Sequence, residues 1–114
     1  MSPSLRTPAW RLIGLTRSEP GVLSYTDGRL SYRTEDGLLF DVPLSDVSNV
    51  VFPWVYFGGG VKLVADGEAY RFSFVTPNDA LSSPLTGAGP VGIAAGRRAG
   101  AEWKRVLART ARSR

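Results

Sequence analysis

Hydrophobic and polar residues follow two different spacings along this chain. In residues 29–34, Leu30 and Tyr32 alternate with polar neighbours, which predicts a strand with one buried and one solvated face. In residues 94–112, apolar residues recur every three or four positions, which is the spacing of an amphipathic helix. The alternating pattern comes first and the helical pattern last, so the sequence predicts a mainly β fold with one C-terminal α-helix.

Seven segments have a strand pattern, in a group of four followed by a group of three. The Asp-Gly pairs at 27–28 and 66–67 predict tight hairpin turns, because both residues tolerate positive φ. Pro53 cannot donate to a ladder, so we expect an edge, a bulge or a bend there. The expected strands are residues 9–15, 21–26, 29–34, 38–43, 47–57, 61–65 and 69–75.

The 114 residues have room for one domain with a single core, which we place at residues 9–112. Residues 1–8 are expected to form a flexible N-terminus and residues 113–114 a short tail. Residues 77–94 are rich in Ser, Pro, Gly and Ala, and we expect a long mobile loop there, because connections of this length are uncommon in compact domains. Trp103 is expected to be the main side chain that packs the helix on the strands.

The chain contains no Cys and no His. Disulfides, thiolate metal sites and cysteine nucleophiles are therefore excluded, and the commonest general base is missing. Asp27, Asp36 and Asp66 each precede Gly, where Asp favours turns through its own hydrogen bonding, so we interpret them as turn residues and not as metal ligands. The sequence predicts a protein that is not an enzyme and needs no cofactor or metal, and no small-molecule substrate is indicated.

The net charge of +4 is unevenly distributed. Residues 1–94 hold 7 Lys and Arg against 9 Asp and Glu, or −2, whereas residues 95–114 hold 7 basic residues against Glu102 alone, or +6. Such a block is either an electrostatic patch for phosphates or anionic lipid, or an ordinary solvated helix face with a frayed tail. The candidate patch consists of Arg97, Arg98, Arg105, Arg109, Arg112 and Arg114.

Residues 52–57 form an aromatic run in which four of the six residues are Phe, Trp or Tyr. Alternation places Trp54 and Tyr56 on one face of a strand and Phe57 on the other, so both faces need cover. Either the loop at 77–94 folds over the second face, or that face binds a partner or a second copy of the chain. Trp54, Tyr56 and Phe57 are therefore the candidate partner surface.

The order of four strands, three strands and a helix bearing a Trp resembles the pleckstrin-homology-like superfold, in particular bacterial PH-like and GRAM-type domains. The segments that carry the resemblance are residues 10–15, 27–32, 42–47 and 70–74 and the helix around Trp103. The resemblance implies a seven-stranded antiparallel barrel of four plus three strands, with one open end capped by the helix. It also implies a role in binding lipid headgroups, peptides or a neighbouring domain. The segment at 77–94 departs from the usual short entry into the helix.

Phosphoinositide-binding members of this superfold carry several basic residues on and after the first strand. This chain offers Arg11 and Arg17 there, with Glu19 close behind, which is a weak set for a headgroup. Specific phosphoinositide recognition is therefore not expected.

Two functional hypotheses remain. The first is an interaction or scaffolding domain that binds a protein partner or self-associates through the aromatic strand and the adjacent loop. The second is a peripheral membrane module that binds anionic lipid without headgroup specificity through the basic helix. Nucleic-acid binding is disfavoured, because the chain has no groove-entering motif and no stacking platform outside the core.

The expected location is the cytoplasm. Residues 1–8 lack the apolar run of a secretory signal, and no stretch approaches the ~18 apolar residues of a membrane span. Under the second hypothesis the protein would associate with the inner face of the membrane.

Overall fold

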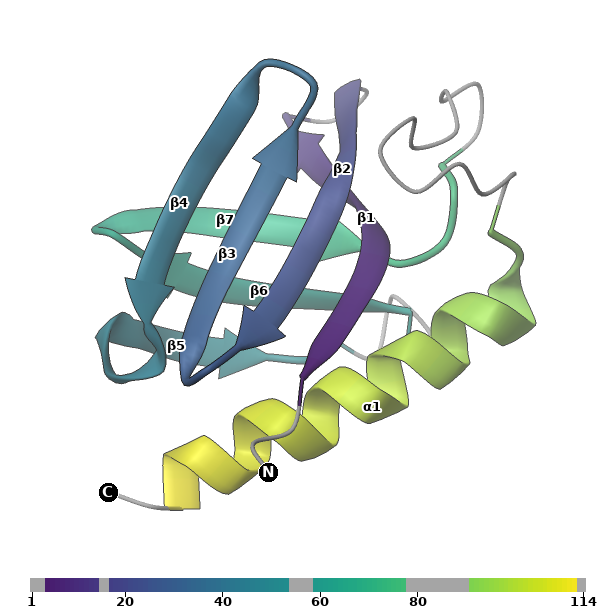
Figure 1. The fold of residues 1–114 in the computed structure, drawn as a ribbon. Coiled ribbons are helices and arrows are strands. Elements are labelled where there is room, and N and C mark those ends of the chain that lie inside the picture. The colour runs from purple at the N-terminus through teal and green to yellow at the C-terminus, as the bar shows by residue number, and fades with distance from the viewer. Residues whose placement is uncertain (1–3, 15–16, 54–58, 78–90, 113–114) are drawn as a thin grey trace.

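The computed structural model describes residues 4–14, 17–53, 59–77 and 91–112, with helix side chains described as far as Leu107. Seven strands precede one long helix, as the sequence predicts (Figure 1). In chain order the elements are β1 (Leu5–Ile13), β2 (Arg17–Thr26), β3 (Arg29–Thr34), β4 (Gly37–Pro43), the 3₁₀ turn η1 (Leu44–Asp46), β5 (Val47–Val51), β6 (Gly60–Ala65), β7 (Glu68–Ser73) and α1 (Ile93–Arg112).

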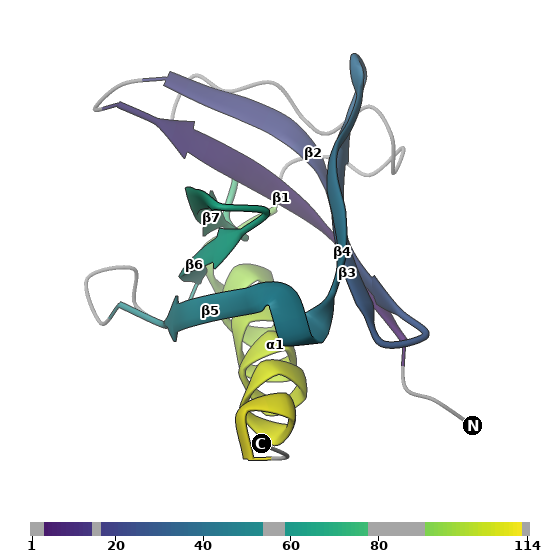
Figure 2. The ribbon, with the colours of Figure 1, turned by 90° about the vertical axis from the view of Figure 1, so that its left-hand side faces the viewer.

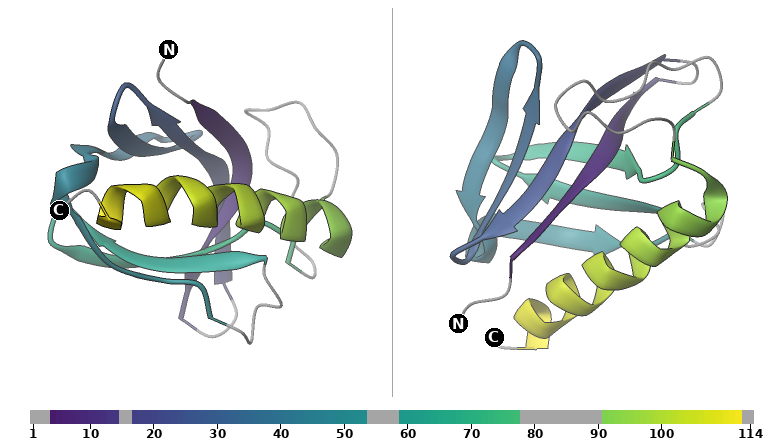
Figure 3. Two further views of the ribbon diagram at one scale, coloured as in Figure 1. Left: turned by 90° about the horizontal axis from the view of Figure 1, so that it is seen from below. Right: turned by 45° about the vertical axis from the view of Figure 1, so that its right-hand side comes forward.

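The strands form one antiparallel sheet in the order β4-β3-β2-β1-β7-β6-β5. β1 joins the group of four to the group of three, because it pairs with β2 along its length and with β7 at Trp10 and Arg11. The sheet curls into a half-barrel whose outer strands, β4 and β5, are connected by η1 (Figure 2). α1 runs across one end of this half-barrel (Figure 3).

The two Asp-Gly turns have the predicted geometry. Asp27 and Gly28 have φ of 53° and 76°, and Asp66 and Gly67 have φ of 52° and 77°. Positive φ at both central residues is the mark of the type I′ turn, whose twist matches that of the flanking strands. These turns set the β2–β3 and β6–β7 registers.

Several strand boundaries differ from the sequence prediction. β1 begins at Leu5, so residues 5–8 belong to the sheet and not to a flexible N-terminus. β2 begins at Arg17, because the β1–β2 ladder continues past Pro20 to the end of β1. β5 ends at Val51 and β7 at Ser73, both earlier than expected. Phe52 and Pro53 are thus outside any strand, and residues 54–57 lie outside the described residues.

The core lies on the concave side of the sheet and is rich in aromatic rings. Tyr32 and Phe72 have ring centroids 4.6 Å apart, and Phe40 and Tyr70 4.9 Å apart. β6 and β7 also alternate, because Leu63 is buried whereas Lys62 and Ala69, which point the other way, are exposed.

Trp103 docks α1 on the half-barrel, as predicted. Its side chain is fully buried, its ring stacks on Phe74 at 6.3 Å, and its Nε1 donates a hydrogen bond of 2.8 Å to Oγ1 of Thr7. Leu107 is also buried, one helical turn further on. These contacts define the inner face of the helix.

Gly96 of the helix packs against Phe74 and Val75, the two residues that follow β7. A Cβ at this position would lie 2.3 Å from Cγ2 of Val75 and 3.1 Å from the carbonyl oxygen of Phe74. Gly96 is therefore required by packing, although glycine lowers helix propensity.

The segment expected as a loop at 77–94 is shortened at its C-terminal end, where hydrogen bonds tie Val91 to Thr76 and the helix starts early. Thr76 and Val91 form two hydrogen bonds, from Thr76 N to Val91 O at 3.0 Å and from Val91 N to Thr76 Oγ1 at 2.7 Å. The helix then begins at Ile93, one residue before the predicted start. Residues 78–90 lie outside the described residues.

Candidate functional site

Four cationic side chains lie on the outer face of α1. Arg97, Arg98, Lys104 and Arg105 are exposed, whereas Trp103 and Leu107 point to the core. The two pairs of cations are seven residues apart, so they are stacked two turns apart on the same side of the helix. Because Trp103 fixes the inner face, the helix presents these four residues, here called the basic face, to solvent.

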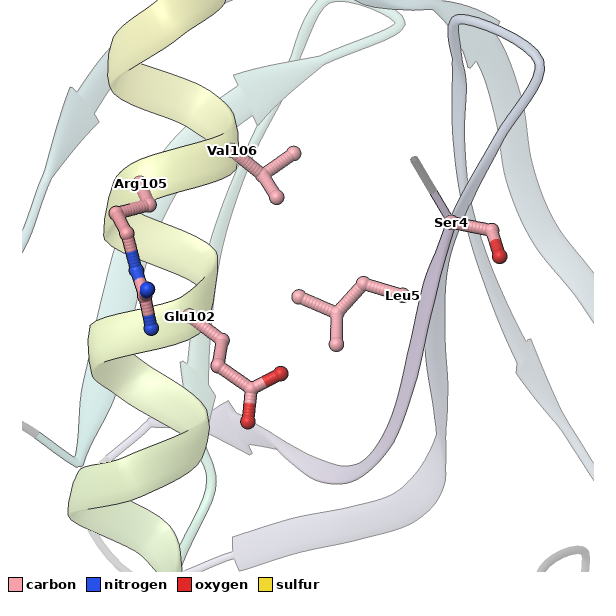
Figure 4. Close-up of a pocket in the computed structure, with 5 residues that line it drawn as sticks. All are labelled: Ser4, Leu5, Glu102, Arg105 and Val106. Carbon is pink, nitrogen blue, oxygen red and sulfur yellow. The ribbon is translucent and has the colours of Figure 1, made fainter. Parts of the chain in front are cut away.

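The basic face has no neutralising partner among the described carboxylates. In the described part of the chain the ion pairs join Arg11 to Glu19 at 3.9 Å and Arg29 to Asp41 at 2.9 Å, both within the sheet. Glu102 belongs to the same helix, but its carboxylate points from α1 toward Leu5 and forms no ion pair with Arg105 (Figure 4). Within the described part of the chain, no ion pair therefore neutralises a side chain of the basic face.

A groove runs beside the basic face, between α1 and the start of β1. Its volume is about 290 Å³, and its lining residues are Ser4, Leu5, Glu102, Arg105 and Val106. Leu5 and Val106 point into the gap, Ser4 points away from it, and Arg105 stays along the helix (Figure 4). The groove thus has apolar walls, with a carboxylate and a guanidinium at the margin.

The structure brings together only part of the predicted basic patch. Arg97, Arg98 and Arg105 belong to the basic face. Arg109 and Arg112 continue α1, but their side chains, like all of Arg114, lie outside the described residues. The sequence analysis missed Lys104, although its distance of seven residues from Arg97 places it on the same side of a helix.

The predicted partner surface cannot be placed. Trp54, Tyr56 and Phe57 all lie outside the described residues. The strand that leads to them is an outer strand of the sheet, and Val51 at its end is 51% exposed. Phe52, the next residue, is partly buried against the core.

A second cluster of polar side chains lies where β1 is flanked by β2 and β7. The Arg11 guanidinium lies 5.1 Å from the centroid of the Tyr70 ring and pairs with Glu19, while the Tyr70 hydroxyl donates a hydrogen bond of 2.9 Å to Glu68. The cation is thus paired with one carboxylate, and the ring that it covers is hydrogen-bonded to a second. This arrangement repels a phosphate and argues against a headgroup clamp at Arg11.

Two tyrosines of this region have raised pKa values. Burial raises the pKa of Tyr32, and burial and the hydrogen bond to Glu68 raise the pKa of Tyr70. Both shifts keep the phenol neutral, which is the opposite of what activates a tyrosine as a base or nucleophile. Among the described residues, no group of three or more Asp and Glu is placed to hold a metal ion.

No family model, curated protein or solved structure matches this chain. No helix in the described part of the chain is long and apolar enough to span a membrane. Function therefore has to be inferred from the surface chemistry of the described residues.

Proposed function

We propose that this protein is a binding domain that docks the basic face of α1 on an anionic surface, namely the anionic lipid of a membrane. The observation that carries the proposal is the exposure of Arg97, Arg98, Lys104 and Arg105 on the one side of α1 that the half-barrel leaves uncovered. A helix that lies across the end of a rigid half-barrel presents a ridge that a flat surface can contact along its length. The resemblance to PH-like and GRAM-type domains is compatible with such a role, at the inner face of the membrane in the cytoplasm.

The strength of this attraction follows from the number of charges. Each basic residue near an anionic membrane contributes about 1 kcal/mol, so four give about 4 kcal/mol before any contribution from Arg109 and Arg112. That corresponds to weak, reversible binding of about millimolar strength. Selectivity for one headgroup is not expected, because Arg11 is paired with Glu19.

The proposal is tested by pelleting the full chain with vesicles of phosphatidylcholine, with and without phosphatidylserine, at low salt. The double variant Arg98→Glu/Arg105→Glu should abolish pelleting with phosphatidylserine. The matched control, Arg6→Glu/Arg33→Glu, changes the net charge equally at two exposed positions on the sheet and should still bind. Equal loss in both variants would mean that only net charge matters, and this would overturn a role for the basic face.

A second candidate function is binding of a protein partner, or self-association, through the aromatic run at 52–57. The observation that favours it is the position of β5, an outer strand that leads directly into this run with Val51 exposed. Outer strands carry free backbone groups that another chain can pair with. Sedimentation of the wild type against a Trp54 variant tests this candidate.

A further inference from the structure

The outer face of β5, β6 and β7 carries a hollow that belongs neither to the core nor to the basic face of α1. Its volume is about 330 Å³, and the outward side chains around it are Asn49, Val51, Lys62, Val64, Ala69 and Arg71. Two of these are cations, three are apolar, and no Asp or Glu is among the described residues that line the hollow. This composition complements a ligand that carries both a negative charge and an apolar group.

The strand register places the two cationic residues opposite each other. Lys62 and Arg71 are direct partners in the β6–β7 ladder. Like charges in this position repel each other and destabilise a sheet. Neither residue has an ion pair with a described carboxylate, and Arg71 is held by a hydrogen bond of 2.6 Å to the carbonyl oxygen of Gly14 that leaves its charge uncompensated. An added anion would relieve the repulsion.

The apolar residues lie beside this pair of charges. Val51 is the partner of Lys62 in the β5–β6 ladder and is 51% exposed. Val64 and Ala69 are partners in the next row of β6 and β7, and Ala69 is exposed. The hollow thus places the apolar side chains of Val51 and Val64 next to the two cations, which could bind a carboxylate.

We propose that this hollow docks a short acidic segment of a protein partner, with a carboxylate between Lys62 and Arg71 and an apolar side chain against Val51 and Val64. A protein segment fits better than a membrane, because a flat bilayer cannot enter a hollow and a headgroup phosphate makes no use of the valines. The surface involves β5, β6 and β7 only, so it is independent of the basic face of α1.

The test is a titration of the isotope-labelled full chain with the synthetic peptide EVEVEV, followed through backbone amide chemical shifts. Shift changes should centre on Val51, Lys62, Val64 and Arg71. The peptide KVKVKV should produce none, because its charge is reversed, and ESESES should bind more weakly, because it lacks the apolar side chains. Shift changes centred on α1, equal effects of the three peptides, or no effect of EVEVEV would each overturn the proposal.

Two variants separate binding from folding. Lys62→Glu places a carboxylate opposite Arg71, so it should preserve or raise the melting temperature while it weakens EVEVEV binding by about tenfold. Lys104→Glu on the basic face is the matched control and should leave the peptide affinity unchanged. An unchanged affinity of the Lys62 variant contradicts the proposal. A further arm with phosphatidylserine vesicles should shift α1 amides only, and vesicle-induced shifts at the hollow would assign it to a membrane instead.

Discussion

The indole Nε1 of Trp103 donates a hydrogen bond of 2.8 Å to Oγ1 of Thr7, and this contact joins the only helix described to the first strand. The same ring stacks on Phe74 at an interplanar angle of 4°. Trp103 therefore satisfies its polar N–H while it buries its apolar body, which is the condition for a stable buried tryptophan. Thr7, expected in a flexible N-terminus, pairs with Leu23 in the β1–β2 ladder and also accepts this hydrogen bond.

Trp103→Ala should lower the free energy of unfolding by about 3–5 kcal/mol, because it removes a large buried aromatic side chain. Against a typical total of ~5–15 kcal/mol, this loss is enough to unfold a marginal domain. Denaturant unfolding measures the change. Thr7→Val is the milder companion, with an expected loss of about 1 kcal/mol for one hydrogen bond. A Trp103→Ala protein that melts within a few degrees of wild type would contradict the docking of α1.

Gly96→Ala should destabilise the protein, although alanine is the better helix former. The new Cβ would lie 2.3 Å from Cγ2 of Val75, and such overpacking costs about 1–3 kcal/mol against a propensity gain of about 1 kcal/mol. Thermal melting measures the sum of the two effects. Adding Val75→Ala removes the clashing methyl group and should recover stability relative to Gly96→Ala alone. A higher melting temperature for Gly96→Ala than for wild type would contradict this prediction, because it would mean that Val75 moves to accommodate the new Cβ.

Stability should fall as the pH rises above 10, and Tyr32 should be a main cause. Its single hydroxyl proton is shared between the carbonyl oxygens of Glu19 at 2.7 Å and Ala9 at 3.1 Å, and its oxygen accepts from the backbone N–H of Arg11 at 3.3 Å. Burial raises the pKa of this phenol above its ordinary value of 10.0, so the unfolded chain releases the proton first. The folded state binds more protons above that pH, and the free energy of unfolding therefore decreases. Tyr70, whose pKa is also raised, contributes in the same direction.

Tyr32→Phe tests this assignment through the slope of stability against pH. The variant should lose about 1–3 kcal/mol at neutral pH, because two carbonyls and one N–H lose their partner. Its stability should then fall less steeply than that of wild type between about pH 9 and 11, as followed by urea unfolding. Parallel curves for the two proteins would remove Tyr32 as the titrating group.

Binding of the basic face to anionic vesicles should weaken with salt. Exposed charges are screened within ~8 Å at physiological ionic strength, so vesicle pelleting should be greatest at low salt and fade as salt is added. Arg105→Gln/Arg109→Gln/Arg112→Gln should reduce pelleting at every salt concentration. If it leaves pelleting unchanged, the basic end of the chain is a solvated helix face and no more.

Trp54→Glu distinguishes the two interpretations of the aromatic run. If Trp54 anchors an interface, the variant should dissociate an oligomer or complex with little change in melting temperature, because interface anchors contribute mainly to association. Analytical ultracentrifugation and thermal melting of the same sample report both quantities. A variant that aggregates or fails to fold would place Trp54 in the core and rule out the interface.

The sequence by itself determined the type and order of most secondary-structure elements and which face of each is buried. Alternation in residues 29–34 predicted the bounds of β3, the Asp-Gly pairs predicted two type I′ turns, and the spacing around Trp103 predicted the docked face of α1. Each of these features depends on neighbours within about one turn or one hairpin, so a local pattern specifies it.

Only the tertiary structure decided the features that join distant parts of the chain. Thr7 of β1 accepts a hydrogen bond from Trp103, and Gly96 is needed because Val75 lies beneath it. Val51 lies beside Lys62 because β5 pairs with β6 as an outer strand of the sheet. The physical reason is the same in each case: a contact between residues far apart in sequence depends on how the whole sheet curls, and no local spacing encodes that curvature.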